Sequence, residues 1–95
     1  MYVVIFRATI AATDQEYLST AEKLRKRAMQ EFGCTNFTSL CEGNQELTLS
    51  YWPSLEHIAR WRNDPEHQAA QIKGRRSWYR DFQVEVAKIH QQPGK

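Results

Sequence analysis

The nine residues YVVIFRATI, positions 2 to 10, are dense in β-branched and aromatic side chains. This composition predicts a strand, and apolar residues occupy both of its alternating faces. A strand that is apolar on both faces must be covered on two sides. We therefore expect a sheet that is packed against helices on one face and against a second surface on the other.

The segment after this strand predicts a long amphipathic helix. Thr13 or Asp14 can cap it, and apolar residues then recur at helical spacing over about 18 residues, as far as Phe32. The opposite face carries the charged run 22–27, which is typical of a solvated surface, and we assign it no function. Gly33 ends the helix in the manner of a C-cap.

Two strand-like segments follow, 34–42 and 45–52, and the Gly-Asn pair between them predicts a hairpin. Cys34 and Cys41 lie an odd number of positions apart on the first of these predicted strands. Their side chains should point to opposite faces of the sheet, so we expect no disulfide between them.

The second helical region is interrupted. Ser54 is a plausible cap for a short helix, and Asp64 with Pro65 starts another, since Asp is a good cap and Pro fits the first helical position. This helix should end near Gly74. The segment 80–90 then alternates apolar with polar residues, as a half-buried strand does.

The predicted order is therefore β-α-β-β-α-β, an α+β fold of the ferredoxin-like type, as one domain over residues 1–92 with a disordered tail at 93–95. Both helical regions cover one face of the antiparallel sheet in this plan. Its other face would be bare and apolar in a monomer, and such a patch usually marks an interface. We expect a homodimer that pairs sheet against sheet.

Composition excludes several classes of protein. With 41% apolar and 25% charged residues the chain resembles an ordinary globular domain and not a disordered one. No stretch reaches the roughly 18 apolar residues of a membrane span, so we expect a cytoplasmic protein without membrane contact. His57, His67 and His90 show no zinc-ligand spacing, and we predict no metal site.

The segment WRNDPEH, residues 61–67, holds the most suggestive side chains. On an unbroken helix Trp61 and His67 would lie about 120° from the same face, so only a bend at Asp64-Pro65 can bring them together. The helix start disfavours a charged imidazole, and a neutral one can accept a proton or bind a metal. Trp61 is either a core residue or a pocket wall, and His67 either functions or makes a structural hydrogen bond.

Residues 51–89, YWPSLEHIARWRNDPEHQAAQIKGRRSWYRDFQVEVAKI, resemble the C-terminal half of small antibiotic biosynthesis monooxygenase-type domains. The resemblance implies a dimeric α/β barrel of two ferredoxin-like units. Related proteins include cofactor-independent monooxygenases that act on aromatic polyketides, and also heme-degrading monooxygenases. The heme-degrading branch places an asparagine on the first strand, where this chain offers only Arg7 and Thr9 as polar residues.

From the residues and the resemblance together we predict a monooxygenase that oxidises a small aromatic or quinol-type compound with O2 and no bound cofactor. His67 would act as the base and Trp61 would position the ring. The remaining substrate-binding residues would be basic or aromatic: Trp52, Arg75, Trp78 and Tyr79. The alternatives are a heme-binding or heme-degrading protein, and a catalytically silent dimer that binds a small ligand.

The basic and aromatic segment KGRRSWYR, residues 73–80, also raises the possibility of RNA binding, because RNA-recognition domains share this order of elements. Their stacking aromatics lie in a K/R-G-F/Y-G/A-F motif on the third strand, and QELTLSYW contains none. The net charge of +2 also gives little attraction to phosphate. We expect no nucleic-acid partner, and we expect this segment to fix the junction between the last helix and the last strand.

Overall fold

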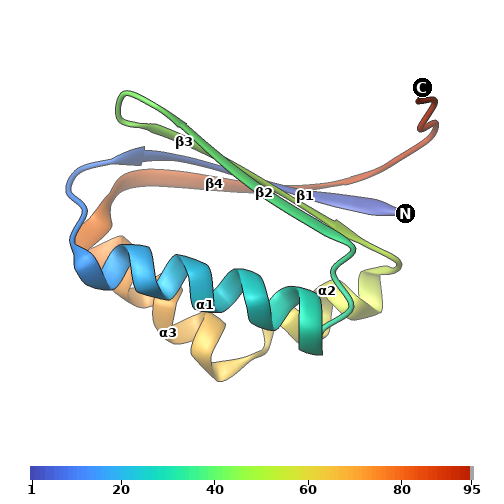
Figure 1. Cartoon of the computed structure of the whole chain (residues 1–95), viewed down its shortest axis with the longest axis horizontal. Coiled ribbons are helices and arrows are strands. Elements are labelled where there is room, and N and C mark those ends of the chain that lie inside the picture. The colour runs from blue at the N-terminus through green and yellow to red at the C-terminus, as the bar shows by residue number, and fades with distance from the viewer. Residues whose placement is uncertain (95) are drawn as a thin grey trace.

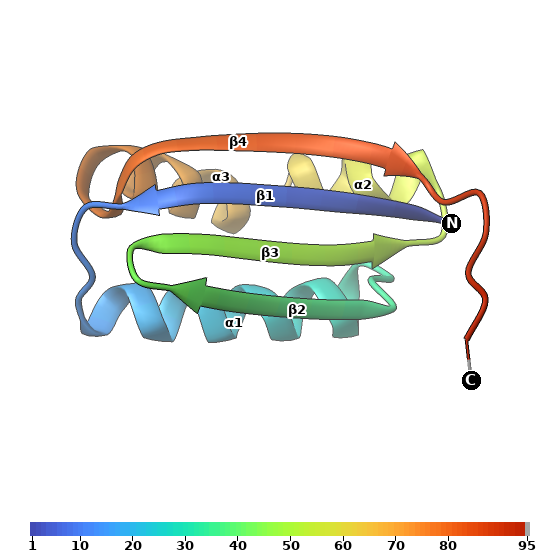
Figure 2. The same ribbon diagram turned by 90° about the horizontal axis from the view of Figure 1, so that it is seen from above.

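A computed structural model describes residues 1–94 and shows a four-stranded antiparallel sheet with all helices on one face (Figure 1). The strand order is β2-β3-β1-β4, which Figure 2 shows from above the open face. The elements are β1 (Tyr2–Ile10), α1 (Gln15–Glu31), β2 (Asn36–Glu42), β3 (Gln45–Trp52), α2 (Leu55–Arg62), α3 (Pro65–Lys73), the π-helical turn η1 (Gly74–Trp78) and β4 (Tyr79–Lys88). The predicted ferredoxin-like order is confirmed, with its second helical region divided.

Two predicted boundaries differ from the structure. The last helical region does not end near Gly74 but continues in π-helical conformation to Trp78, immediately before β4. Cys34 lies before β2 and not on it, so the prediction that both cysteines share one strand is wrong. Cys34 is buried and Cys41 is exposed. The predicted tail at 93–95 includes Lys95, which lies outside the described residues.

The helix ends follow from their capping residues. Asp14 accepts a hydrogen bond from the backbone N–H of Tyr17 at 2.8 Å, and Ser54 accepts one from the N–H of His57 at 3.2 Å. Gly33 follows α1 with φ of 85°, where a side chain would be strained. A Cβ atom there would also approach the His57 ring to 2.6 Å.

The sequence predicts that the charged face of α1 is solvated. In the structure this is wrong for one residue of that face. Arg27 is only 22% exposed, and its guanidinium donates to the Asp64 carboxylate at 2.5 Å. Asp64 is itself buried at 7% exposure. The ion pair therefore ties α1 to the first turn of α3, two elements that come together only in the folded chain.

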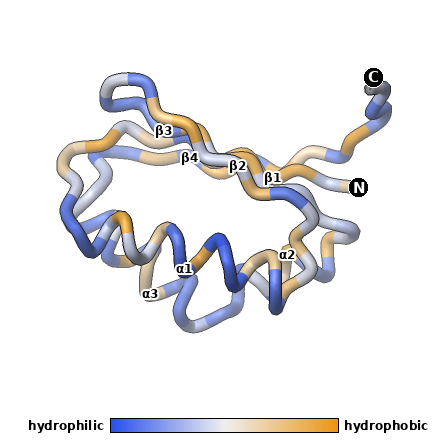
Figure 3. The backbone as a smooth tube through the Cα atoms, in the orientation of Figure 1, coloured by the Kyte–Doolittle hydropathy of each residue, from blue (hydrophilic) through white to orange (hydrophobic). Residues whose placement is uncertain are grey.

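The sheet has one face toward the helices and one open face. On β1, Val4 and Phe6 point toward the helices, so Val3 and Ile5 lie on the open face. On β3 the pattern is inverted relative to an ordinary half-buried strand: polar Glu46, Thr48 and Ser50 point toward the helices, and Leu47, Leu49 and Tyr51 lie on the open face. Hydrophobic segments accordingly gather in the sheet, while much of α1 is hydrophilic (Figure 3).

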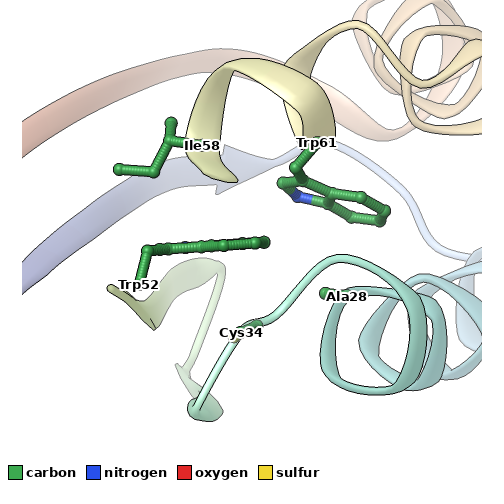
Figure 4. Packing of buried hydrophobic residues seen from close by; sticks show 5 residues of the cluster. All are labelled: Ala28, Cys34, Trp52, Ile58 and Trp61. Carbon is green, nitrogen blue, oxygen red and sulfur yellow. The ribbon is translucent and has the colours of Figure 1, made fainter. Parts of the chain in front are cut away.

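A small aromatic core closes one end of the space between sheet and helices. It consists of Ala28, Cys34, Trp52, Ile58 and Trp61. In Figure 4 the Trp52 ring is seen edge-on with the Trp61 ring next to it, and their centroids are 6.2 Å apart. None of the helices within residues 1–94 is long and apolar enough to cross a membrane.

Candidate functional site

A cavity of about 390 Å³ lies between the sheet and the helices. Its volume falls within the range of roughly 300–1,000 Å³ that is common for small-molecule sites. Most of the wall of the cavity is apolar or aromatic. Its lining includes Val4, Phe6, Tyr17, Leu18, Ser39, Glu46, Thr48, Ser50, Ile58, Trp61, His67, Trp78, Tyr79, Phe82 and Val84. Leu18, which is 64% exposed, also lines it, so the cavity reaches solvent beside α1.

The break between α2 and α3 places Trp61 and His67 against each other. Asp64 caps α3 by accepting a hydrogen bond from the N–H of His67 at 3.0 Å, and Pro65 occupies the first helical position. The indole and imidazole rings are stacked, with centroids 4.3 Å apart and an interplanar angle of 13°. Both side chains line the cavity, so the predicted bend brings the two residues into one pocket.

The hydrogen bonding of His67 defines the chemistry that is open to it. Its Nδ1 lies 3.1 Å from the backbone carbonyl oxygen of Trp61, and only a protonated Nδ1 can donate to that carbonyl. Burial lowers the pKa of His67, against smaller opposing effects of this hydrogen bond and of Asp64. The neutral imidazole therefore carries a free lone pair on Nε2, which suits it to accept a proton. The neutral form that the sequence predicts is supported, and burial is the largest cause of the lowered pKa.

Trp61 fits both interpretations that the sequence left open. It is 6% exposed and packs against Phe32 and Trp52, as a core residue does, yet it also forms part of the cavity wall. Trp52 lies behind it. Its side chain is fully buried, its indole N–H donates to the Ser50 hydroxyl at 2.9 Å, and it does not line the cavity.

Two of the remaining predicted site residues line the cavity, and the third does not. Trp78 and Tyr79 line the cavity, near the start of α1. Arg75 does not. Its guanidinium lies over the Phe82 ring at 5.2 Å and borders a separate surface depression. In residues 1–94 no three His, Cys, Asp or Glu side chains gather in a way that could hold a metal ion.

Sequence reasoning missed Glu46, which forms the polar end of the cavity. Its carboxylate is 7% exposed, accepts hydrogen bonds at Oε1 from the hydroxyls of Tyr17 and Tyr79, and accepts one at Oε2 from Thr48 at 3.0 Å. The Ser39 hydroxyl lies 2.5 Å from that of Thr48 and extends the chain. The alternation of polar and apolar residues in QELTLSYW was a signal that Glu46, Thr48 and Ser50 form a polar stripe on one face of β3.

The two tyrosines that bond to Glu46 are held as neutral donors. Burial is the main reason that the pKa values of Tyr17 and Tyr79 are raised, and the adjacent Glu46 carboxylate raises both further. Gly74 allows Tyr79 to take its place, because a Cβ atom there would lie 2.9 Å from the tyrosine ring. The π-helical turn therefore fixes one side of the polar end.

This fold and cavity define a small ferredoxin-like protein with a mostly apolar cavity between its sheet and its helices. Residues 1–73 match the family described as antibiotic biosynthesis monooxygenase, and the chain belongs to that family. It is 39% identical over 92 residues to the uncharacterized protein YqjZ of Bacillus subtilis, covering 96% of this chain and 81% of that protein.

Two further relatives extend this comparison. Over 93 residues the chain is 29% identical to a jasmonate monooxygenase of Pyricularia oryzae, covering 94% of this chain but only 43% of that protein. The crystal structure of SnoaB, a cofactor-independent oxygenase from Streptomyces nogalater, superimposes with a TM-score of 0.82 at 14% identity, covering 99% of this chain and 97% of the other. At that identity the likeness shows a shared fold alone.

Proposed function

We propose that the protein is a cofactor-independent monooxygenase that oxidises a hydroxylated aromatic compound with O2 inside the cavity. The observation that carries the proposal is a half-buried, neutral imidazole stacked on an indole in the wall of a mostly apolar cavity. Family membership supports the class of reaction. A protein of the same fold is described as a cofactor-independent oxygenase, so the fold is compatible with oxidation that uses no cofactor.

In the proposed reaction the substrate ring lies against Trp61, whose rigid indole restricts its orientation. His67 Nε2 accepts the proton of a phenolic O–H and leaves an electron-rich phenolate. A ring carbon of the phenolate forms a bond to O2, and the protonated product is a hydroperoxide. The O–O bond then breaks. One oxygen atom stays on carbon as a quinone carbonyl, and the other leaves as water with the proton from His67 and the former ring hydrogen. The substrate supplies all four electrons that reduce O2.

The experiment that tests this proposal is oxygen uptake by the purified protein with a panel of hydroxynaphthalenes. His67→Ala should lower kcat about 100-fold or more, which is the usual contribution of a positioned base. His90→Ala is the matched control because His90 is exposed and lies outside the cavity lining. Binding without oxygen uptake would favour the catalytically silent alternative, and undiminished turnover by His67→Ala would contradict the role of the histidine.

Heme binding is the second candidate, and one observation favours it. A histidine that binds iron commonly donates its other ring N–H to a backbone carbonyl, as His67 does to Trp61. His67 Nε2 would then hold the iron, and heme would supply oxygen activation at the metal. A shift in the absorption spectrum of hemin that is lost in His67→Ala would support this candidate over the cofactor-free reaction.

We also propose that the protein is a homodimer that pairs the open faces of two sheets. The open face carries Val3, Ile5, Leu47, Leu49 and Tyr51. Leu40 of β2 adds to it with 63% of its surface exposed. Covering these side chains would bury an apolar surface that is partly exposed in a single chain, at a gain of about 25 cal/mol per Å².

A further inference from the structure

The polar end of the cavity contains a buried charge without a counter-ion. Glu46 is 7% exposed, and none of the ion pairs formed within residues 1–94 includes it. Hydroxyl groups surround it instead. A carboxylate at such a position in a mostly apolar wall is costly, and structural needs alone would favour an apolar residue there.

The hydrogen bonds of Glu46 leave one acceptor position open. A carboxylate has about four lone-pair positions. Tyr17 and Tyr79 both donate to Oε1, whereas Oε2 receives a single bond, from Thr48. Oε2 of Glu46 is therefore the acceptor at this end that a ligand could still use.

A free acceptor at the polar end of the cavity matches a ligand group that can donate a hydrogen bond. A ligand hydroxyl does this, since its hydrogen can bond to Oε2 of Glu46. An ether oxygen cannot donate, and an anionic group would be repelled by the carboxylate. The chemistry of this end therefore favours a hydroxyl over an ether or an anion.

The length of the cavity extends the argument to the shape of the ligand. Glu46 lies at one end and Ser50 near the other, four positions along β3, which corresponds to about 14 Å at roughly 3.4 Å per residue. Trp61 and His67 lie toward the Ser50 end, since Trp61 stacks on Trp52 just beyond it. A single hydroxylated ring is too short to reach both ends.

We infer that Glu46 anchors a hydroxyl on one edge of a bicyclic or larger aromatic substrate while His67 receives the proton of a hydroxyl on the opposite edge. This inference rests on the proposed function for the role of His67. Glu46 is a binding and orienting residue in this account. It sets which edge of the ring system faces the imidazole.

A thermodynamic cycle that combines one protein substitution with one change of ligand, measured by calorimetric titration, tests the anchor without requiring turnover. The two probes are 2,6-dihydroxynaphthalene and 2,6-dimethoxynaphthalene, which share a ring system and differ in O–H groups. Glu46→Gln should weaken binding of the diol about five- to tenfold, because a charge-assisted hydrogen bond becomes a neutral one, and should leave the dimethyl ether unchanged. Glu42→Gln, an exposed carboxylate at the end of β2, should change neither.

The wild-type protein provides a second measurement that does not depend on any variant folding. It should bind the diol more tightly than the ether. Equal affinities, a parallel loss of both ligands in Glu46→Gln, or no binding of either probe would overturn the inference. If His67→Ala abolishes oxidation while the probes bind equally, the proposed function stands and the anchor fails. If the diol is selected but no oxygen is consumed, the anchor stands and the proposed function fails.

Discussion

Replacing Asp64 by alanine should destabilise the protein more than the loss of an ordinary helix cap. Asp64 caps α3 through the N–H of His67 and also accepts from Arg27 of α1. Losing a cap costs about 1 kcal/mol, and because Asp64 is buried, its removal leaves a shielded N–H without a partner and brings the cost of the cap alone to about 2 kcal/mol. The broken ion pair with Arg27 adds to this loss.

Two further variants separate these contributions. Asp14→Ala removes the exposed cap of α1, which forms no ion pair within residues 1–94, and should cost about 1 kcal/mol. Asp64→Asn keeps the capping oxygen and removes the charge, so it should fall between the wild type and Asp64→Ala. The assay is equilibrium unfolding in urea followed by circular dichroism, at one fixed protein concentration because association would shift the apparent stability.

The outcome of this series bears on the site as well as on stability. If Asp64 holds the break between α2 and α3, its loss frees His67 from Trp61, and ligand binding should weaken along with stability. A cost for Asp64→Ala no larger than that for Asp14→Ala would refute the reasoning. A gain in stability would show that the two helices do not need the break.

Three further substitutions test the π-helical turn, the buried side of the imidazole and the open face of the sheet. Gly74→Ala should cost about 1–3 kcal/mol, since the added methyl meets the Tyr79 ring at 2.9 Å; an unchanged melting temperature would show that the tyrosine moves freely. His67 has a lowered pKa when folded, so its contribution to stability is present above about pH 6.5 and is lost as the pH falls toward the folded pKa; His67→Gln should flatten that part of the unfolding profile, and an identical slope would contradict it. Ile5→Asp on the open face should yield monomers in light scattering, whereas Leu55→Asp, on a helix residue that is 54% exposed, should not; dimers in both variants would contradict the proposed interface.

Local rules predicted the fold and part of the site. The cap and proline at Asp64-Pro65 act within a few residues, so the helix break, and with it the meeting of Trp61 and His67, followed from the sequence. The ion pair between Arg27 and Asp64 joins residues that are 37 positions apart. Such a pair leaves no local pattern in the sequence, so helical spacing alone predicts a solvated position for the arginine.

Glu46 was missed for a different reason. Alternation along β3 separates Glu46, Thr48 and Ser50 from the leucines between them, but it does not say which set points toward the helices. Hydrophobic burial in a single chain would favour the opposite orientation. The observed orientation is the one expected if, as proposed, Glu46, Thr48 and Ser50 face a ligand and the leucines face a partner chain.

The most direct test of the account is isotope labelling of the reaction with ¹⁸O2 and a dihydroxynaphthalene, with no metal or cofactor added. The account predicts that the wild-type product carries one labelled oxygen atom on carbon and that the other appears in water, and that His67→Ala forms this product at least about 100-fold more slowly. A product that contains no labelled oxygen, or one that is formed equally fast without the imidazole, would contradict the claim that this cavity performs a base-assisted monooxygenation.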